Sequence, residues 1–206
     1  MSANASIHGR NRVLIAQEAA RIIAGEGVKD YRLAKRKAAE RLGLRANGDM
    51  PRNSEVEAAL KEHQRLFGGE SQARHLRALR ATAVEAMRYF ARFRPRLVGS
   101  VLSGTAGNHA AVELHLFADT PEEVMLFLIE HDIPYRSSER RFRLSAEEYA
   151  WYPVYVFAAD QVGIDLSVFP ASGLRRAPLC PIDGRPMQRA DLAQVERLAA
   201  GALPLS

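Results

Sequence analysis

Carboxylate and imidazole side chains lie in two segments of the chain that have the residue pattern of β-strands. Glu113 and His115 are two residues apart in residues 110–117, where apolar and polar residues alternate, so both lie on one face. Asp165 lies inside the apolar segment of residues 163–169. A carboxylate without a partner is costly in such surroundings. This cost favours a functional reading of Asp165.

A glycine-rich turn precedes the first of these segments. The chain reads Gly99-Ser100-Val-Leu-Ser-Gly104-Thr105-Ala106, and the Ala111–Leu114 segment follows. This stretch resembles the signature of the nucleotidyltransferase superfamily with the DNA polymerase beta-like fold, especially its minimal bacterial members. The resemblance covers roughly residues 85–170 and implies an order of helix, strand, Gly-Ser turn, second strand and helix.

The resemblance implies a nucleotidyl transfer site. Gly99 and Ser100 match the phosphate-contacting pair of the family, with Thr105 in the segment that follows, and a turn of this kind lets backbone amides approach a triphosphate. Glu113 takes the place of the second carboxylate and Asp165 that of the third. In the family, carboxylates hold two Mg²⁺ ions, or Mn²⁺ in their place, and the ions clamp the attacking and leaving oxygens.

One position departs from the family pattern. Ala111 stands where the family has its first carboxylate, and alanine cannot bind a metal ion. His115 is on the same strand face as Glu113 and is a candidate third metal ligand, although imidazole suits softer metals better than Mg²⁺. The implied site is therefore degenerate at one carboxylate.

Each candidate also has a purely structural reading. Gly99-Ser100 alone is a common turn, Glu113 is compatible with a solvent-facing strand residue, and His115 with a packed side chain that makes a structural hydrogen bond. The single cysteine, Cys180, excludes an internal disulfide and a cysteine-rich zinc site. No catalytic signature surrounds it.

The elements that position these residues form an α+β fold. Short apolar or alternating segments near residues 96–102, 110–117, 141–144, 152–159 and 163–169 predict the strands of a mixed sheet. Thr120, Pro121 and Glu123 form a capping box that opens a helix, and Asp191 caps a last short helix. We expect a nucleotidyltransferase-like sheet with flanking helices over residues 96–206.

The first part of the chain, residues 1–95, is predicted to be a basic helical region. Residues 1–10 read as a tail, and Asn11 is a candidate N-cap of the first helix. Asp30 is a candidate cap of a second helix over residues 31–44, and two further helices follow near residues 54–67 and 71–93.

Charge is divided unevenly between these parts. Residues 1–96 hold 20 Lys and Arg against 10 Asp and Glu, and residues 97–206 hold 9 against 14. Such asymmetry predicts a basic surface that faces RNA or DNA. On the second predicted helix Lys35, Arg36, Lys37 and Arg41 are the candidate phosphate contacts. The alternative is a solvated helical surface.

Three functions are compatible with the sequence, of which the first is our prediction and the other two are alternatives. The first is a transferase that moves a nucleotidyl group from a nucleoside triphosphate to an unknown hydroxyl acceptor. The second is a degenerate relative that binds nucleotide or nucleic acid without turnover, as a regulator. The third is a helical DNA-binding regulator. Because the chain has no apolar run of about 20 residues and no signal peptide pattern, we expect a cytoplasmic protein without a membrane partner.

Overall fold

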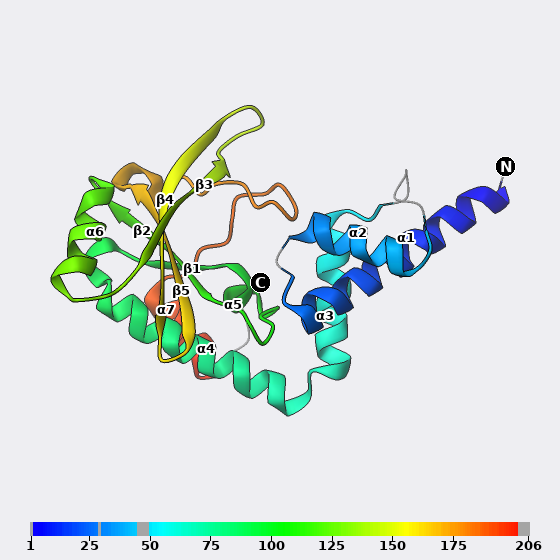
Figure 1. Cartoon of the computed structure of the whole chain (residues 1–206), viewed down its shortest axis with the longest axis horizontal. Coiled ribbons are helices and arrows are strands. Elements are labelled where there is room, and N and C mark those ends of the chain that lie inside the picture. The colour runs from blue at the N-terminus through cyan, green and yellow to red at the C-terminus, as the bar shows by residue number, and fades with distance from the viewer. Residues whose placement is uncertain (1, 29, 45–49, 202–206) are drawn as a thin grey trace. The chain divides into compact units, whose positions relative to one another are not determined.

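The structure is a computed structural model that describes residues 2–28, 30–44 and 50–201 (Figure 1). It has an α+β fold in which N-terminal helices precede a five-stranded mixed sheet with flanking helices, which confirms the predicted fold class. Contacts group the chain into two compact units. The first comprises residues up to 73, 105–109 and 181–183, and the second comprises 74–104, 110–180 and the residues from 184. The division at residue 95 expected from the sequence stays a prediction.

The first unit is built from helices α1 (Ser2–Glu26), α2 (Tyr31–Arg41) and α3 (Asn53–Phe67). Asp30 caps α2 as predicted, since its side chain accepts hydrogen bonds from the backbone N–H groups of Arg32 and Leu33. The core is rich in alanine, and such small side chains allow helices to approach closely. Its buried members are Ile15, Ala16, Ala19, Ile22, Ala34, Ala38, Ala39 and Val56.

The first helix begins earlier than the sequence pattern indicated. Helix α1 starts at Ser2, so the predicted tail over residues 1–10 and the predicted cap at Asn11 are wrong over the described residues. No proline interrupts residues 2–26, and a single Gly9 costs a helix only about 1 kcal/mol. The capping pattern at Asn11 therefore lies inside a continuous helix.

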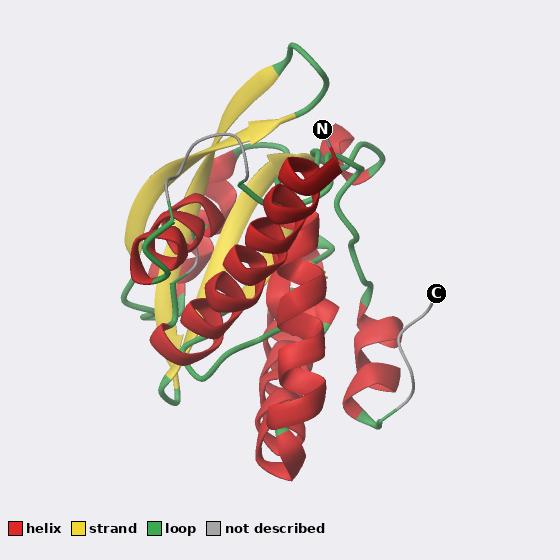
Figure 2. Cartoon of the chain, turned by 90° about the vertical axis from the view of Figure 1, so that its right-hand side faces the viewer, coloured by secondary structure: helices red, strands yellow, loops and turns green. Residues whose placement is uncertain are grey.

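The second unit is organised by one sheet with the strand order β1-β2-β5-β4-β3. Its members are β1 (Arg96–Val98), β2 (Val112–Ala118), β3 (Arg136–Arg143), β4 (Tyr149–Ala159) and β5 (Val162–Pro170). Strands β2 and β5 run parallel, and every other pair is antiparallel. The β3–β4 hairpin extends beyond the other strands (Figures 1 and 2).

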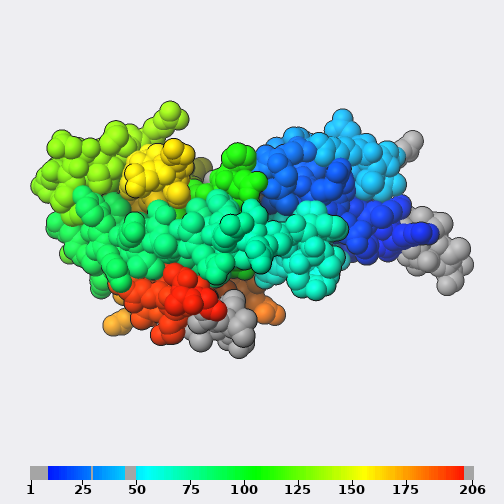
Figure 3. All heavy atoms as spheres, turned by 90° about the horizontal axis from the view of Figure 1, so that it is seen from below, coloured from blue at the N-terminus to red at the C-terminus, as the bar shows by residue number. Residues whose placement is uncertain are grey.

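Helices cover one face of this sheet. Phe90, which follows α4 (Gly69–Tyr89), packs against Phe127 of α6 (Pro121–Glu130) and against Phe157 of β4. Helix α7 (Leu192–Ala199) lies beside α4, where Arg88 and Glu196 form an ion pair at 2.7 Å (Figure 3). Side chains alternate between the two faces of a strand, so every second residue of β4, counted from Phe157, faces this apolar helical layer. The residues between them face the other side of the sheet.

Local capping signals in the second unit were predicted correctly. Thr120 and Glu123 form the capping box of α6, and Asp191 caps α7. The strand predicted at residues 141–144 is longer and begins at Arg136. Among the described residues, no helix has both the length and the apolar composition needed to cross a lipid bilayer.

Candidate functional site

The two candidate carboxylates are neighbours in the sheet. Strands β2 and β5 are parallel, with Glu113 in register with Asp165 and His115 in register with Ser167. Register partners on adjacent strands point to the same side, so all four side chains lie on the face opposite α4 and α6. The register thus makes these strands neighbours and places both carboxylates on one face.

The Gly-Ser turn lies directly against Glu113. Strand β1 ends at Val98, and the short helix α5 (Gly99–Ser103) begins with Gly99 at a φ of 71°. A Cβ on Gly99 would lie 2.8 Å from both Cδ and Oε1 of Glu113. Only glycine allows this approach without a shift, because its φ is positive and it lacks a Cβ. Ser100 follows as a half-buried residue of α5.

Thr105 is placed differently from the other candidate nucleotide contacts. It is buried and groups with the first unit, and its carbonyl accepts a hydrogen bond from the Gln64 amide at 3.0 Å. Its contact with a nucleotide stays a prediction.

Asp165 is held by an arginine that the sequence did not reveal. Arg140 of β3 reaches across β4, and its Nη1 and Nη2 donate to Oδ1 and Oδ2 of Asp165 at 3.2 and 2.6 Å. Nη1 also lies 3.5 Å from Oγ of the buried Ser167. Burial lowers the pKa of Arg140, but the bond to Asp165 and the charges of Asp165 and Glu113 outweigh it and raise the pKa overall.

His115 is buried beside a second arginine. Its side chain is 2% exposed, and Nδ1 accepts a hydrogen bond from Nε of Arg189 at 3.0 Å. Arg189 also donates to the carbonyl of Gly173 at 2.7 Å, and its guanidinium lies over the rings of Phe117 and Phe169. Burial and the positive charge of Arg189 hold the pKa of His115 well below its usual value, so the imidazole is neutral. Burial also lowers the pKa of Arg189 to about 10.

These residues do not fit the two-metal centre that the family resemblance implies. Both carboxylate oxygens of Asp165 face Arg140, and Ala111 stands beside Gly163 in the place of the first carboxylate. Within residues 2–28, 30–44 and 50–201, no group of three or more His, Cys, Asp or Glu side chains could hold a metal ion. Metal binding by Glu113, His115 and Asp165 therefore stays a prediction from the sequence.

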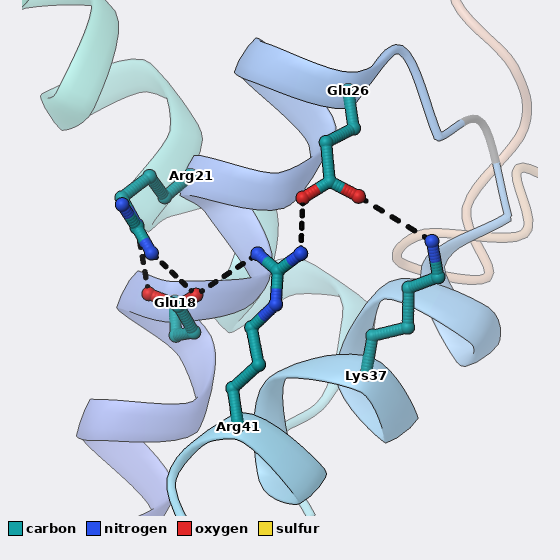
Figure 4. Close-up of polar contacts among 5 residues, drawn as sticks. All are labelled: Glu18, Arg21, Glu26, Lys37 and Arg41. Carbon is teal, nitrogen blue, oxygen red and sulfur yellow. Dashed lines mark hydrogen bonds and ion pairs between the residues drawn. The ribbon is translucent and has the colours of Figure 1, made fainter.

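The candidate nucleic-acid contacts on α2 are mostly engaged within the first unit. Lys37 pairs with Glu26 at 3.3 Å, and Arg41 pairs with Glu26 at 2.5 Å and with Glu18 at 3.4 Å (Figure 4). Lys35 donates to the carbonyl of Pro51 at 3.0 Å.

Arg36 is exposed, and it is the member of the four that forms neither an ion pair nor a side-chain hydrogen bond with the described residues, whereas the exposed Arg41 is paired. Much of the basic charge on α2 is thus balanced by carboxylates of α1. The contact of this helix with RNA or DNA stays a prediction.

Comparison of the chain with protein-family models found none that matches, and comparison with curated proteins found none that is similar. The resemblance to nucleotidyltransferases therefore stays a prediction from the sequence, carried by Gly99, Ser100, Glu113 and Asp165.

Proposed function

We propose that the second unit is a degenerate nucleotidyltransferase-like domain that binds a nucleoside triphosphate on the sheet face opposite α4 and α6. One observation carries the proposal: the Gly99-Ser100 turn packs directly on Glu113, and Glu113 is in register with Asp165. A backbone turn beside two paired strands is the arrangement that a phosphate chain needs for close approach. Bound nucleotide then serves as a regulatory signal.

Binding without turnover is favoured over transfer by two features. Transfer of a nucleotidyl group needs several carboxylates to hold its metal ions, and one of their places is taken by Ala111. The third carboxylate of the implied site, Asp165, is paired with Arg140 at 2.6 Å. A site with these changes retains phosphate recognition and loses the groups that activate a hydroxyl acceptor.

Transfer to a hydroxyl acceptor remains the second candidate function, because Glu113 and Asp165 are register partners on one face. If the chain is a transferase, Glu113→Gln and Asp165→Asn each abolish metal-dependent release of pyrophosphate while the fold persists. Glu139→Gln is the matched control, since Glu139 is an exposed carboxylate on the opposite side of β3. Full activity in either site variant would exclude that carboxylate as a metal ligand.

The proposed binding is tested by calorimetric titration of the full chain with ATP, GTP, CTP and UTP. Each titration is run in EDTA and again with Mg²⁺ or Mn²⁺, and pyrophosphate release is followed in parallel. We expect at least one triphosphate to bind without release of pyrophosphate. Absence of binding by all four triphosphates under all three conditions would overturn the proposal.

A further inference from the structure

The sheet face opposite α4 and α6 carries more positive than negative charge. Arg96 is in register with His115, and Arg136 has the same parity on β3 as Arg140, so both lie on this face, together with Arg140 and Arg189. The carboxylates there are Glu113 and Asp165. Four cations against two anions make this face more favourable for a polyanion than for a free metal ion.

Arg140 is more accessible than the carboxylate with which it pairs on this face. Its side chain is 42% exposed, whereas that of its partner Asp165 is 12% exposed. The guanidinium therefore covers the carboxylate and borders solvent itself. A guanidinium has five N–H donors in a planar fork, and the bonds to Asp165 and Ser167 use only part of them.

A phosphate group can replace the carboxylate as the partner of Arg140. Guanidinium binds carboxylate and phosphate in the same bidentate geometry, so the exchange requires no new type of contact. A polyphosphate chain carries more charge than one carboxylate, and Arg96 and Arg189 add positive charge to the same face. The exchange is therefore driven by charge, and it leaves Asp165 without its ion-pair partner.

We propose that Arg140 is the phosphate-binding residue of this face and that Asp165 holds it until a polyphosphate chain takes its place. This proposal deepens the proposed function, because it names the group that recognises the ligand, but it concerns the polyphosphate chain and not the base or sugar. Asp165 is then a competitor of the ligand and not a metal ligand.

The two possible roles of Asp165 predict opposite changes in polyphosphate affinity when Asp165 is replaced by asparagine. If Asp165 competes for Arg140, Asp165→Asn tightens polyphosphate binding by about fivefold, the equivalent of one part-exposed ion pair. If Asp165 binds a metal ion, the same variant weakens binding in Mg²⁺ and changes nothing in EDTA. Arg140→Gln weakens binding by about 10- to 100-fold, as expected for loss of charged hydrogen bonds.

The test is calorimetric titration with inorganic tripolyphosphate and, separately, with ATP, in EDTA. The matched control is Arg141→Gln, which removes the same charge from the adjacent residue, whose guanidinium lies over the Tyr149 ring at 3.9 Å. Because Arg140→Gln leaves Asp165 without its ion-pair partner, the double variant Arg140→Gln/Asp165→Asn is included. We expect it to bind as weakly as Arg140→Gln, with a circular dichroism spectrum like that of the parent.

Each outcome separates the two proposals. If tripolyphosphate binds through Arg140 and ATP binds no more tightly than tripolyphosphate, the role of Arg140 is supported. The proposal that the ligand is a nucleotide is then overturned. ATP binding that Arg140→Gln leaves unchanged would retain the nucleotide and overturn the role of Arg140. Failure of tripolyphosphate to bind the parent and Asp165→Asn at millimolar concentration, or a weaker Asp165→Asn in EDTA, would also overturn it.

Discussion

Nε of Arg189 donates to Nδ1 of His115 at 3.0 Å, and this bond fixes the protonation state of the buried imidazole. Nδ1 can accept only if it carries no proton, so the proton of the neutral ring is on Nε2. Protonation of Nδ1 would bring two cations together inside a site that is 2% exposed at His115. The folded protein therefore resists taking up this proton.

This resistance predicts a pH dependence of stability. The folded pKa of His115 is lowered well below 6.5 by burial, whereas the unfolded chain binds the proton near pH 6.5. The unfolded state thus holds more protons below pH 6.5, and the free energy of unfolding falls by up to about 1.4 kcal/mol per pH unit as the pH is lowered from there. Urea unfolding between pH 7.5 and 5, followed by fluorescence of Trp151, the single tryptophan, measures it.

The variant His115→Gln should flatten this profile, because glutamine does not titrate. His109→Gln, at an exposed position, is the control and should keep the slope of the parent. Equal slopes in the parent and in His115→Gln would contradict a neutral buried imidazole.

Gly99→Ala should destabilise the second unit for two separable reasons. Alanine in the left-handed region costs about 1–2 kcal/mol, and its Cβ would also meet the Glu113 carboxyl group at 2.8 Å. Gly184→Ala separates the two terms, since Gly184 has a φ of 73° and nothing within 4 Å of its Cβ position. We expect a lower urea midpoint for Gly99→Ala than for Gly184→Ala. Equal midpoints would mean that the Glu113 side chain moves away from the new Cβ without lowering the free energy of unfolding.

Ala111→Asp should restore a metal-dependent step in nucleotide binding. Residue 111 lies beside Gly163, which has no side chain, and it precedes Glu113 by two residues. A carboxylate there, beside that of Glu113, adds an oxygen ligand of the kind that Mg²⁺ and Mn²⁺ prefer. The measurement is triphosphate affinity with metal divided by affinity in EDTA. Ala110→Asp is the neighbouring control, and an equal ratio in both variants would count against a degenerate metal site.

The basic helix α2 should bind RNA and DNA weakly and in a salt-dependent way. Replacing Lys35, Arg36, Lys37 and Arg41 by alanine is expected to weaken binding alike for all sequences and to flatten the salt slope by about one unit per lost contact. Glu26→Gln should strengthen binding, because Lys37 and Arg41 lose their ion pairs with Glu26 and their positive charges are no longer neutralised by it.

Fluorescence anisotropy with labelled oligonucleotides at low and moderate salt measures both effects. A charge-matched control replaces four exposed arginines of the second unit by alanine, namely Arg92, Arg94, Arg175 and Arg185. No binding at low salt would remove nucleic acid as a partner of this helix. Equal weakening by both sets would assign binding to net charge alone.

Features that depend on local sequence were predictable. The alternation of apolar and polar residues over 110–117 predicted strand β2 and the strand face on which Glu113 lies. The capping residues predicted where α6 and α7 begin. Glycine followed by serine marked the turn against Glu113, since a positive φ favours glycine. Each of these signals lies within a few residues of the structure that it determines.

Features that depend on pairing between distant segments were not predictable. Arg140 was missed because β3 is an exposed edge strand, rich in Arg and Ser, without the alternation that marks a half-buried strand. Arg189 lies in a loop-rich segment, and its bond to His115 joins residues 74 positions apart. Likewise, the charge balance of the first region gave no sign that Glu18 and Glu26 of α1 neutralise α2.

The two edges of the sheet are protected against association with other chains in different ways. At β1, the backbone of Leu97 exchanges two hydrogen bonds of 2.9 Å with Ala190, so that edge is closed. At the other edge, strand β3 carries arginines at positions 136, 140, 141 and 143, of which Arg140 points inward across β4. A second copy of β3 that approached this edge would bring like charges together, and charged edge strands oppose sheet extension in this way. The strand that supplies Arg140 to the site thus also keeps the sheet from growing into an aggregate.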